Sequence, residues 1–445
     1  MSIDEHRPAN ASPGPRGYLR HIPTQAKRQH GSAWAVERQL LQWALEQLGQ
    51  PPLRFVLWDG SQISPRGLDP ELELRVKDRG ALWQLISFPE FQFPEMYTQG
   101  RVETDHDLVR VLEVVQRARL RLDPNNLKRR LMSALFRPNS GSLAAARENI
   151  ASHYDVGNDF YRLWLDPQMV YTCAYFPTAD TSLEDAQHAK LDLVCRKLRL
   201  QPGEQVIEAG CGWGALAMHM ARHYGVRVRA FNISKAQLAF ARERAAREGL
   251  SDAVEFIEGD YREISGSCDA FVSVGMLEHV GRRHYPDLGR VMDRCLAADG
   301  RGLIHTIGTD RPGPLNAWIE RRIFPGAYPP SLGEMMPLFG PSGFSVLDVE
   351  NLRRHYALTL HHWLARFDAA QERVRTMYDP IFERAWRFYL AASESAFSIG
   401  QLQLFQVVFA RKGSNDISWT REHLYRSRRP PAEPYSKGIS TLLGK

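Results

Sequence analysis

The sequence predicts an α/β protein, in which a small α+β domain precedes a larger, doubly wound and mainly parallel sheet. One observation is the run "EQVIEAGCGWGALAMHMARHYG", residues 204–225, which combines a buried strand, a glycine-rich turn and a helix. Another is the series of strand-like runs that follow it, "VRVRAFNIS", "AVEFIEGDY", "CDAFVSVGMLEHVG" and "GRGLIHTIG". An alternating pattern of this kind is typical of a parallel sheet covered by helices.

The composition is that of an ordinary globular protein. The chain has 445 residues, 43% of them hydrophobic and 24% charged, so it is long enough for two domains and a large core. Its first residues, "MSIDEHRPANASPGPRGYLRHIP", contain no apolar region of the kind that directs export, and no later run reaches about eighteen apolar residues. The sequence therefore predicts a cytoplasmic protein without a membrane span.

The cysteines predict neither disulfides nor a metal site. No two of them form a C-x-x-C pair and no His-rich zinc spacing accompanies them, so we interpret them as reduced thiols. They are Cys173, Cys195, Cys211, Cys268 and Cys295.

Five regions follow one another along the chain. Residues 1–31 are rich in Pro, Gly, Ser, Arg and His without periodicity, which predicts a disordered or loosely packed N-terminus. Residues 32–116 combine the helical pattern "SAWAVERQLLQWALEQLG" with strand-like runs such as "LRFVLWDG", which predicts the small α+β domain. Residues 117–144 form a basic linker, residues 145–412 carry the α/β pattern, and residues 413–445 form an irregular basic tail.

The basic linker carries a charge excess as large as the formal net charge of the whole chain, +6. Its run "NLKRRLMSALFR" places leucines on one helical face and basic residues on another, a pattern suited to an anionic surface. The alternative is a solvated linker helix that packs on its own domain. No nucleic-acid-binding motif accompanies the charge, so we expect no nucleic-acid partner. The basic residues, against the single acid Asp123, are Arg117, Arg119, Arg121, Lys128, Arg129, Arg130 and Arg137.

The glycine-rich turn indicates a nucleotide-type ligand, because glycines let the backbone approach a bound molecule closely. Its spacing is G-x-G-x-G, unlike the G-x-G-x-x-G of dinucleotide folds, and the next strand ends at Asn232 and Ser234 without an acid for an NAD ribose. Glu208 stands just before the turn. We therefore expect S-adenosylmethionine (SAM) here; a purely structural turn is the alternative. The glycines are Gly210, Gly212 and Gly214.

Polar residues stand where three of the later strands end. Ligands of doubly wound sheets gather at the carboxyl ends of the strands, so these residues should converge on one edge. Taken alone, Glu278 would be interpreted as a helix-start acid satisfied by backbone N–H groups, and His305 as a satisfied strand-end histidine. The polar residues are Asp260, Tyr261, Glu278, His279, His305 and Thr306, and Ile307 follows the last of them.

An aromatic stretch precedes the glycine-rich turn. In "HYDVGNDFYRLWLDPQMVYTCAYF", residues 153–176, six Tyr or Phe residues and one Trp surround Cys173. The remaining machinery of a cysteine enzyme is not found nearby, whereas aromatic faces of this number could stabilise a cation.

These motifs resemble the cyclopropane-fatty-acyl-phospholipid synthase family, which includes the mycolic acid methyltransferases. The resemblance rests on the aromatic stretch, on "EAGCGWG", "FNISKAQ", "GMLEHVG", "IHTIG" and "HYALTL", and on the closing "WRFYLAASESAFSIGQLQLFQVVFAR". It covers about residues 145–412, and residues 32–116 resemble more weakly the lipid-associated N-terminal domain of bacterial members.

The resemblance implies a Rossmann-like class I SAM-dependent methyltransferase domain with helical insertions. It implies methyl transfer from SAM to the cis double bond of an unsaturated acyl chain in a membrane phospholipid, by a homodimer held peripherally at the inner membrane surface. The implied SAM contacts are Tyr171, Thr172, Gly210, Gly212, Gly214, Asn232, Ser234, Gln237, Asp260 and Tyr261. The implied bicarbonate pocket is Cys173, Glu278, His305, Ile307 and Tyr356.

The implied chemistry suits these residue types. An alkene that attacks the sulfonium methyl group becomes a carbocation, which water would quench and aromatic faces can stabilise. Loss of a proton from the transferred methyl group then closes the three-membered ring, and bound bicarbonate can be the base. We expect His305 and Tyr356 to orient it, Glu278 to relay its proton, and Cys173 to form a wall of the pocket and not a nucleophile.

One position departs from the family pattern. Many members carry a cysteine, often labelled catalytic, where "YLAASESAF" here has Ser393. The cation mechanism needs no covalent intermediate, so we expect activity without that thiol. The aromatic residues around it, which we expect mostly in the core, are Trp386, Phe388, Tyr389, Phe397 and Phe405.

Two other functions stay open. The same cation can lose a different proton and yield a methylene- or methyl-branched fatty acid, the latter with a separate reductase. A non-catalytic lipid- or SAM-binding protein is the second alternative, disfavoured because the turn and the pocket set are both intact.

Overall fold

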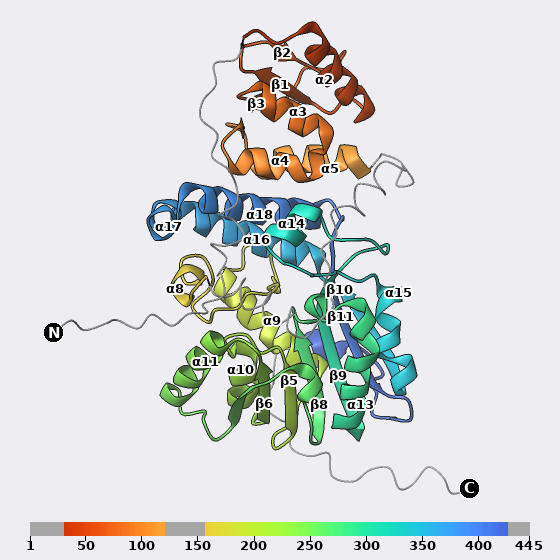
Figure 1. The fold of residues 1–445 in the computed structure, drawn as a ribbon. Coiled ribbons are helices and arrows are strands. Elements are labelled where there is room, and N and C mark those ends of the chain that lie inside the picture. The colour runs from red at the N-terminus through yellow and green to blue at the C-terminus, as the bar shows by residue number, and fades with distance from the viewer. Residues whose placement is uncertain (1–30, 121–155, 426–445) are drawn as a thin grey trace, which may run out of the picture.

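The computed structural model describes residues 31–120 and 156–425, which contain two sheets. A four-stranded sheet belongs to the N-terminal part and a seven-stranded sheet to the remainder, with a layer of long helices between them (Figure 1). The predicted segments outside these ranges include most of the basic linker, the N-terminal extension and the end of the basic tail.

The N-terminal part is an α+β unit. Its sheet has the order β2-β1-β3-β4, in which β1 and β3 are parallel and the two edge strands are antiparallel to their neighbours. The last helix of the unit continues to Leu120, so the first residues of the predicted linker are helical. The elements are α2 Ala35–Gln47, β1 Leu53–Leu57, β2 Gln62–Ile63, β3 Leu72–Val76, α3 Arg79–Ser87, α4 Pro89–Thr98, β4 Val102–Glu103 and α5 Leu108–Leu120.

The larger sheet has the order β10-β11-β9-β8-β5-β6-β7. The five strands from β9 to β7 are parallel, as the sequence predicts, and β11 runs antiparallel between β9 and β10. The chain order reverses between β5 and β8, which is where doubly wound sheets bind ligands. The strands are β5 Gln205–Ala209, β6 Arg227–Asn232, β7 Val254–Glu258, β8 Cys268–Val274, β9 Leu296–Gly308, β10 Phe344–Asn351 and β11 Gln403–Arg411.

Helices cover this sheet, and two groups of them confirm the expected helical insertions. One group lies between β9 and β10 and the other between β10 and β11. The last helix of the described chain lies in the tail that the sequence predicts to be irregular. The α-helices are α8 Asn158–Tyr161, α9 Leu183–Lys197, α10 Ala215–Tyr224, α11 Lys235–Arg247, α12 Leu277–Val280, α13 Tyr285–Cys295, α14 Ala317–Arg322, α15 Leu332–Met335, α16 Arg353–Ala369, α17 Gln371–Met377, α18 Pro380–Ser398 and α19 Glu422–Tyr425. Short 3₁₀ turns span Tyr261–Glu263, Arg282–His284, Met336–Leu338 and Gly340–Ser342.

Helix α18 lies at the centre of the helical layer. It begins sharply, because the Asp379 side chain accepts a hydrogen bond from the backbone N–H of Phe382 and Pro380 fills the first turn. It packs against α16 on one side and against α4 and α5 of the N-terminal unit on the other (Figure 1). The position of α18 therefore links the N-terminal unit to the larger domain.

A buried carboxylate fixes this contact. Glu95 of α4 accepts hydrogen bonds from the Trp318 indole N–H at 2.9 Å and from Arg322 Nε at 2.8 Å, both on α14. Arg387 of α18 donates to the Tyr97 hydroxyl at 2.9 Å. Because these groups are buried or half-buried and hydrogen-bonded, the two parts are held in one arrangement.

No helix within residues 31–120 or 156–425 is long and apolar enough to cross a membrane.

Candidate active site

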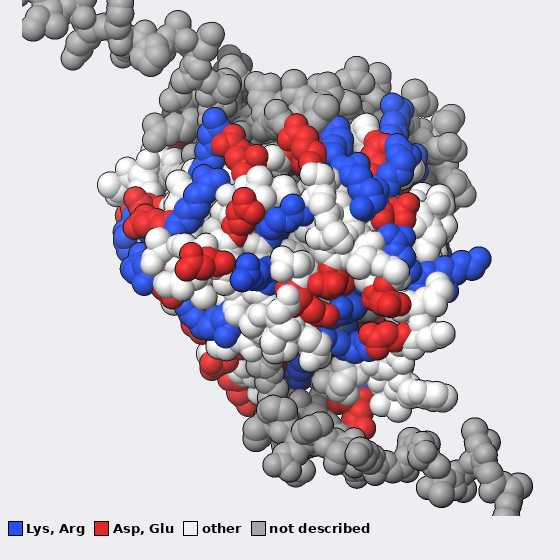
Figure 2. All heavy atoms as spheres, turned by 90° about the horizontal axis from the view of Figure 1, so that it is seen from below, with Lys and Arg blue, Asp and Glu red and all other residues white. Residues whose placement is uncertain are grey.

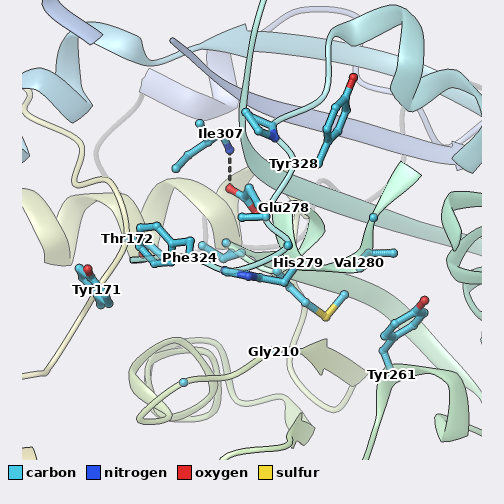
Figure 3. A pocket seen from close by; sticks show the side chains of 18 of the residues that line it. Tyr171, Thr172, Gly210, Tyr261, Glu278, His279, Val280, Ile307, Phe324 and Tyr328 are labelled. Atoms are coloured by element: carbon cyan, nitrogen blue, oxygen red, sulfur yellow. Dashed lines mark hydrogen bonds between the residues drawn. The ribbon is translucent and has the colours of Figure 1, made fainter. Parts of the chain in front are cut away.

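A cavity of about 990 Å³ lies at the carboxyl ends of β5, β6, β8 and β9. Twelve of the predicted site residues line it, so the structure brings most of the set together. In the close-up, Gly210 and Tyr261 lie on one side of Glu278 and Ile307 on the other (Figure 3). The twelve are Tyr171, Thr172, Gly210, Gly212, Asn232, Gln237, Asp260, Tyr261, Glu278, Ile307, Tyr356 and Ser393.

The glycines of the turn have different tasks. All three have positive φ, which favours glycine. A Cβ at Gly214, the residue before α10, would lie 2.6 Å from the Phe256 ring, so this glycine lets the helix pack on the sheet. A Cβ at Gly212 would have no protein atom within 4 Å and would point into open space beside the cavity. Gly212 therefore leaves room for a ligand, and Gly214 leaves room for Phe256.

Hydrogen bonds hold the far side of the turn. The Asn232 amide donates to the Gly212 carbonyl at 3.2 Å and to Gln237 Oε1 at 2.7 Å, which ties the turn to the start of α11. Ser234 accepts from the Gln237 backbone N–H as the cap of that helix. Asp260 accepts from Arg262 Nε at 2.7 Å. The polar ends of three strands are thus fixed around one opening.

Two buried titratable side chains, Glu208 and Lys190, lie beside the turn. Glu208, the acid before the glycines, is 2% exposed and one of its oxygens has no hydrogen-bond partner among the described residues. Burial raises its pKa to about 8, an effect that the Lys190 ammonium partly offsets. Burial lowers the pKa of Lys190 to about 8, and this group donates to Thr172 Oγ1 at 3.0 Å. A ligand with positive charge near Glu208 would favour the carboxylate form.

Glu278 is the buried acid of the cavity. Its Oε1 accepts a hydrogen bond from the Ile307 backbone N–H at 2.5 Å, drawn as a dashed line in Figure 3. Its Oε2 is buried without a hydrogen-bond partner among the described residues. Burial raises the pKa of Glu278 to about 7, against the opposing effect of the Ile307 N–H. A carboxyl group with this pKa can take up and release a proton near neutral pH. The neighbouring His279 stays neutral, because burial lowers its pKa to about 4.

A chain of hydrogen bonds fixes the tautomer of His305. Lys197 Nζ donates to Gln406 Oε1 at 2.6 Å, so the amide nitrogen of Gln406 must point away from Lys197 and towards His305. That nitrogen lies 3.0 Å from His305 Nδ1, which therefore accepts, and the ring proton must be on Nε2. Burial lowers the pKa of His305 well below its usual value, so the ring is neutral. His305 thus offers a buried N–H that has no acceptor in the described structure.

Aromatic rings form the apolar wall of the cavity. The hydroxyl groups of Tyr171 and Tyr389 lie 2.8 Å apart, which holds the end of the aromatic stretch against α18. The ring of Tyr356 lies 4.5 Å from that of Phe397, and the ring of Phe324 lies 5.5 Å from that of Tyr389, centre to centre. These faces exclude water and can stabilise a cation.

The structure corrects several interpretations of the sequence. Cys173, expected as a pocket wall, does not line the cavity, and its buried thiol donates to the Ala174 carbonyl. Gly214 allows α10 to pack on the sheet and Ser234 caps α11, and neither residue lines the cavity. His305 also lies behind the lining, although the nearby Ile307 is part of it. Burial raises the pKa of the Cys173 thiol, which disfavours the thiolate form that a nucleophile needs.

The aromatic residues near Ser393 divide between core and site. All five are buried, as expected, and Tyr389 and Phe397 also line the cavity, whereas Trp386, Phe388 and Phe405 do not. Lining residues that the sequence did not identify as site residues include Lys190, Phe324 and Tyr328. The position of Glu208 just before the glycines could have identified it as a site residue from the sequence. Lys190 lies within the regular helix α9, where no local pattern distinguishes it.

Comparison with known proteins identifies the family. A family model described as mycolic acid cyclopropane synthetase matches residues 142–407. The chain belongs to this family. It is therefore a SAM-dependent methyltransferase, as the glycine-rich turn predicts, and its fold is the class I α/β fold of these enzymes.

Three of its relatives show how far the similarity extends. A probable fatty acid methyltransferase of Pseudomonas putida is 35% identical over 402 residues, which cover 84% of this chain and 96% of that protein. The cyclopropane-fatty-acyl-phospholipid synthase of Escherichia coli K12 is 42% identical over 270 residues, 60% of this chain and 69% of that protein. The structure of the mycolic acid cyclopropane synthase CmaA1, complexed with SAH and CTAB, matches 62% of this chain and 99% of that chain with 31% identity and a TM-score of 0.57.

The residues of this family member fit SAM. The open space beside Gly212 leaves room for the cofactor, and the unpartnered oxygen of Glu208 can accept a hydrogen bond and would become more acidic beside a cationic ligand. SAM supplies the methyl group for transfer. The chain itself holds the site with the Asn232 amide and the buried Lys190.

Substitution of the two glycines should separate ligand binding from folding. Gly212→Ala places a methyl group in ligand space, at a backbone cost of about 1–2 kcal/mol for the positive φ. We expect it to abolish SAM binding in calorimetry while the circular dichroism stays native. Gly214→Ala, whose methyl group meets Phe256, should instead lower the unfolding temperature. Normal SAM affinity in Gly212→Ala would contradict this placement of the cofactor.

The tautomer of His305 can be tested with a nearly isosteric change. Gln406→Glu keeps an oxygen for Lys197 but offers His305 an acceptor, so the proton should move to Nδ1 and the pKa of the ring should rise. We expect turnover to fall by about 10²-fold or more, with SAM affinity unchanged, because a positioned proton donor is lost. Nitrogen chemical shifts of the imidazole would report the tautomer. An unchanged tautomer with lost activity would show that Gln406 acts only in packing.

Proposed function

We propose that this methyltransferase acts on the cis double bond of an unsaturated acyl chain in a membrane phospholipid and forms a cyclopropane ring. The observation that carries the proposal is one continuous cavity that joins the glycine-rich turn to aromatic rings and to a buried acid with a pKa of about 7. The transfer step needs the first two features, and the loss of a proton needs the third.

The aromatic wall suits the charge that appears during transfer. When the alkene attacks the methyl group, positive charge develops on the acyl chain, and water at that point would add to it. Tyr171, Tyr389 and Phe397 present rings to the cavity, each able to stabilise a nearby cation by about 0.5–2 kcal/mol. The neutral His279 adds no positive charge that would oppose it.

The buried polar atoms suit bicarbonate. Glu278 Oε2 can accept from a hydroxyl group, and the Nε2–H of His305, behind the lining, can donate to an anionic oxygen. We propose that one anion with both groups reaches the two side chains. In this proposal the Ile307 backbone and Tyr356 complete the pocket. Bicarbonate would supply the base for the proton that the methyl group loses. Glu278, at a pKa of about 7, then passes that proton towards solvent.

Contact with a membrane is supported by tryptophans on the N-terminal unit. Trp34, Trp43 and Trp83 are 57%, 55% and 40% exposed, and Trp and Tyr are the residues enriched at lipid interfaces. The Arg79 guanidinium lies 4.1 Å from the centre of the Trp34 ring. Because the acyl chain is inside a bilayer, we propose that this surface rests on the lipid.

The excess of basic residues in the chain does not lie on the described surface. Acids outnumber bases among residues 31–120 and 156–425, and Figure 2 shows acidic and basic side chains interspersed on the face that it views. Attraction to anionic lipid would therefore rest on the segments outside the described residues, which include Lys128, Arg129 and Arg130. The homodimer implied by the family also remains a proposal, and light scattering of the purified chain checks it.

A methylene- or methyl-branched product is the second candidate. The Pseudomonas putida relative, which aligns over the N-terminal unit as well as the catalytic domain, is named a probable fatty acid methyltransferase. The same cavity serves this outcome if the cation loses another proton. A saturated methyl branch would also need a separate reductase.

Lipid analysis tests the proposal. Purified enzyme with SAM and vesicles of oleoyl phospholipid should add one CH₂ per modified chain, with the proton spectrum of a cyclopropane. Olefinic methylene signals would favour the second candidate, and a further gain of two hydrogens in cells would indicate a reductase. No mass change, with SAM bound, would leave a lipid-binding protein and contradict both.

The membrane contact is tested in the same assay. Trp43→Ser removes an exposed ring, so it should slow the reaction on vesicles while the rate on lipid dispersed in detergent stays unchanged. Ile417→Ser, at an exposed position far along the sequence, is the matched control. Equal rates of Trp43→Ser and wild type on vesicles would overturn the contact.

The proton relay is tested at Glu278. Glu278→Gln should leave SAM affinity nearly intact and lower turnover by about 10²–10⁴-fold, the usual contribution of a positioned acid–base group. The wild-type rate should rise with pH through about 7, as the carboxyl group ionises, and this step should be absent in the variant. Removal of carbonate from the buffer should slow the wild type and affect the variant much less, because both changes disable one unit.

Ser393→Ala is the control for the alternative assignment. Ser393 lines the cavity but takes no part in the proposed relay, so its loss should cost little activity. If Ser393→Ala were inactive while Glu278→Gln stayed active, the assignment of Glu278 would be wrong and the catalytic group would lie on α18.

A further inference from the structure

Three histidines gather between α9 and α10, outside the cavity. His188 is on α9, and His219 and His223 lie one turn apart on α10. One ring nitrogen from each lies within 4.8 Å of the others. The ring centres are 5.0 Å apart for His188 and His219, 5.7 Å for His188 and His223, and 4.5 Å for His219 and His223. None of the three lines the cavity, so the methyl-transfer site does not explain the cluster.

The surroundings of the cluster favour a cation. The carboxylate of Asp192, one turn after His188 on α9, has its Oδ1 4.0 Å from His219 Nε2. The Tyr224 hydroxyl donates to the same oxygen at 2.6 Å, and the Arg196 Nε lies 2.9 Å from the other oxygen. Asp192 is thus held in place beside His219, although Arg196 offsets part of its charge. Carboxylates placed next to metal-binding histidines commonly orient their rings.

An ion in solvent can reach two of the three histidine rings. His188 and His223 are exposed, while His219 is 6% exposed and is held in the helix contact. The buried ring therefore supplies a fixed ligand, and the exposed rings can turn by small rotations to bring three nitrogens to about 2.0–2.1 Å from one ion. Imidazole is a ligand for zinc, copper, nickel and iron.

We propose that His188, His219 and His223 bind one divalent transition-metal ion, with Zn²⁺ as the reference ion, and that the ion holds α9 against α10. Three protein ligands leave a fourth position for water. The spacing around the cysteines predicts no metal site. The H-x-x-x-H pair in "HMARH" is the local signal for this site, and the proposed third ligand, His188, lies 31 positions before His219.

The proposed ion would act on a helix that also serves the cavity. Gln187, next to His188, donates to the Thr172 carbonyl at 2.9 Å, and Lys190 donates to the hydroxyl of the same residue. Thr172 lines the cavity. An ion bound at His188 would therefore steady the helix that positions this wall, without touching the reacting groups.

Titration of the full chain, without a polyhistidine tag and after treatment with a chelator, tests the site. Calorimetry with Zn²⁺ should show one ion per chain, and Co²⁺ should give the d–d absorption of a nitrogen-ligated ion. His188→Gln and His223→Gln should each weaken binding by roughly ten-fold or more, because even the loss of a group behind a ligand costs 10–100-fold. His106→Gln, an exposed histidine of the N-terminal unit, is the matched control and should bind as wild type does.

Thermal unfolding tests the link between the helices. Because an ion that binds the folded state stabilises it, saturating Zn²⁺ should raise the unfolding temperature of the wild type by a few degrees and leave the double variant His188→Gln/His223→Gln unchanged. Both substituted residues are exposed, so circular dichroism should confirm that the variants fold. No ion bound, or equal binding by the double variant, would overturn the site, and binding without a shift would overturn the link.

Discussion

A carboxyl group kept away from water is the constraint on which the catalytic part of the structure depends. Glu278 has a pKa of about 7 because it is buried, and burial of an acid is costly unless a donor meets it. The Ile307 N–H meets one oxygen, and this requires β9 to pair with β8 at the register that brings the strand ends together. The buried, aromatic surroundings that raise the pKa of the acid would also protect the proposed cation from water. One environment therefore serves both steps of the proposed reaction.

The aromatic wall gives α18 its central role. Its Tyr389 and Phe397 face the cavity, while the same helix packs on α4 and α5 of the N-terminal unit. The buried Glu95, bound to Trp318 and Arg322, completes that contact. The N-terminal unit, which carries the proposed lipid contact, is thus joined through α18 to the wall of the cavity.

The sequence predicts the parallel part of the sheet well because local patterns encode it: a buried strand, glycines with positive φ, and an amphipathic helix. It could not separate Tyr389 and Phe397 from Trp386, because a ring that lines a cavity and a ring in the core have the same helical spacing and the same apolar character. The contact of Gln406 with His305 joins residues 101 positions apart across the antiparallel β11, and no local pattern encodes such a pairing. Most of the residues that local motifs predict for the site therefore line the cavity, whereas the places of Tyr389, Phe397 and Gln406 depend on long-range packing.

Neutral His305 shows why these long-range contacts matter for chemistry. A histidine with a free choice of tautomer would present either a donor or an acceptor to the pocket, and only the donor complements an anion. Lys197 removes that choice from a distance: its ammonium group, itself bound to Glu350, orients the Gln406 amide, and the amide orients the imidazole. Each hydrogen bond in this chain has one donor and one acceptor. Replacement of one donor by an acceptor would therefore reverse the direction of the next hydrogen bond. In the proposed function, the proton donor that meets the anion is therefore set by an ion pair that does not line the cavity.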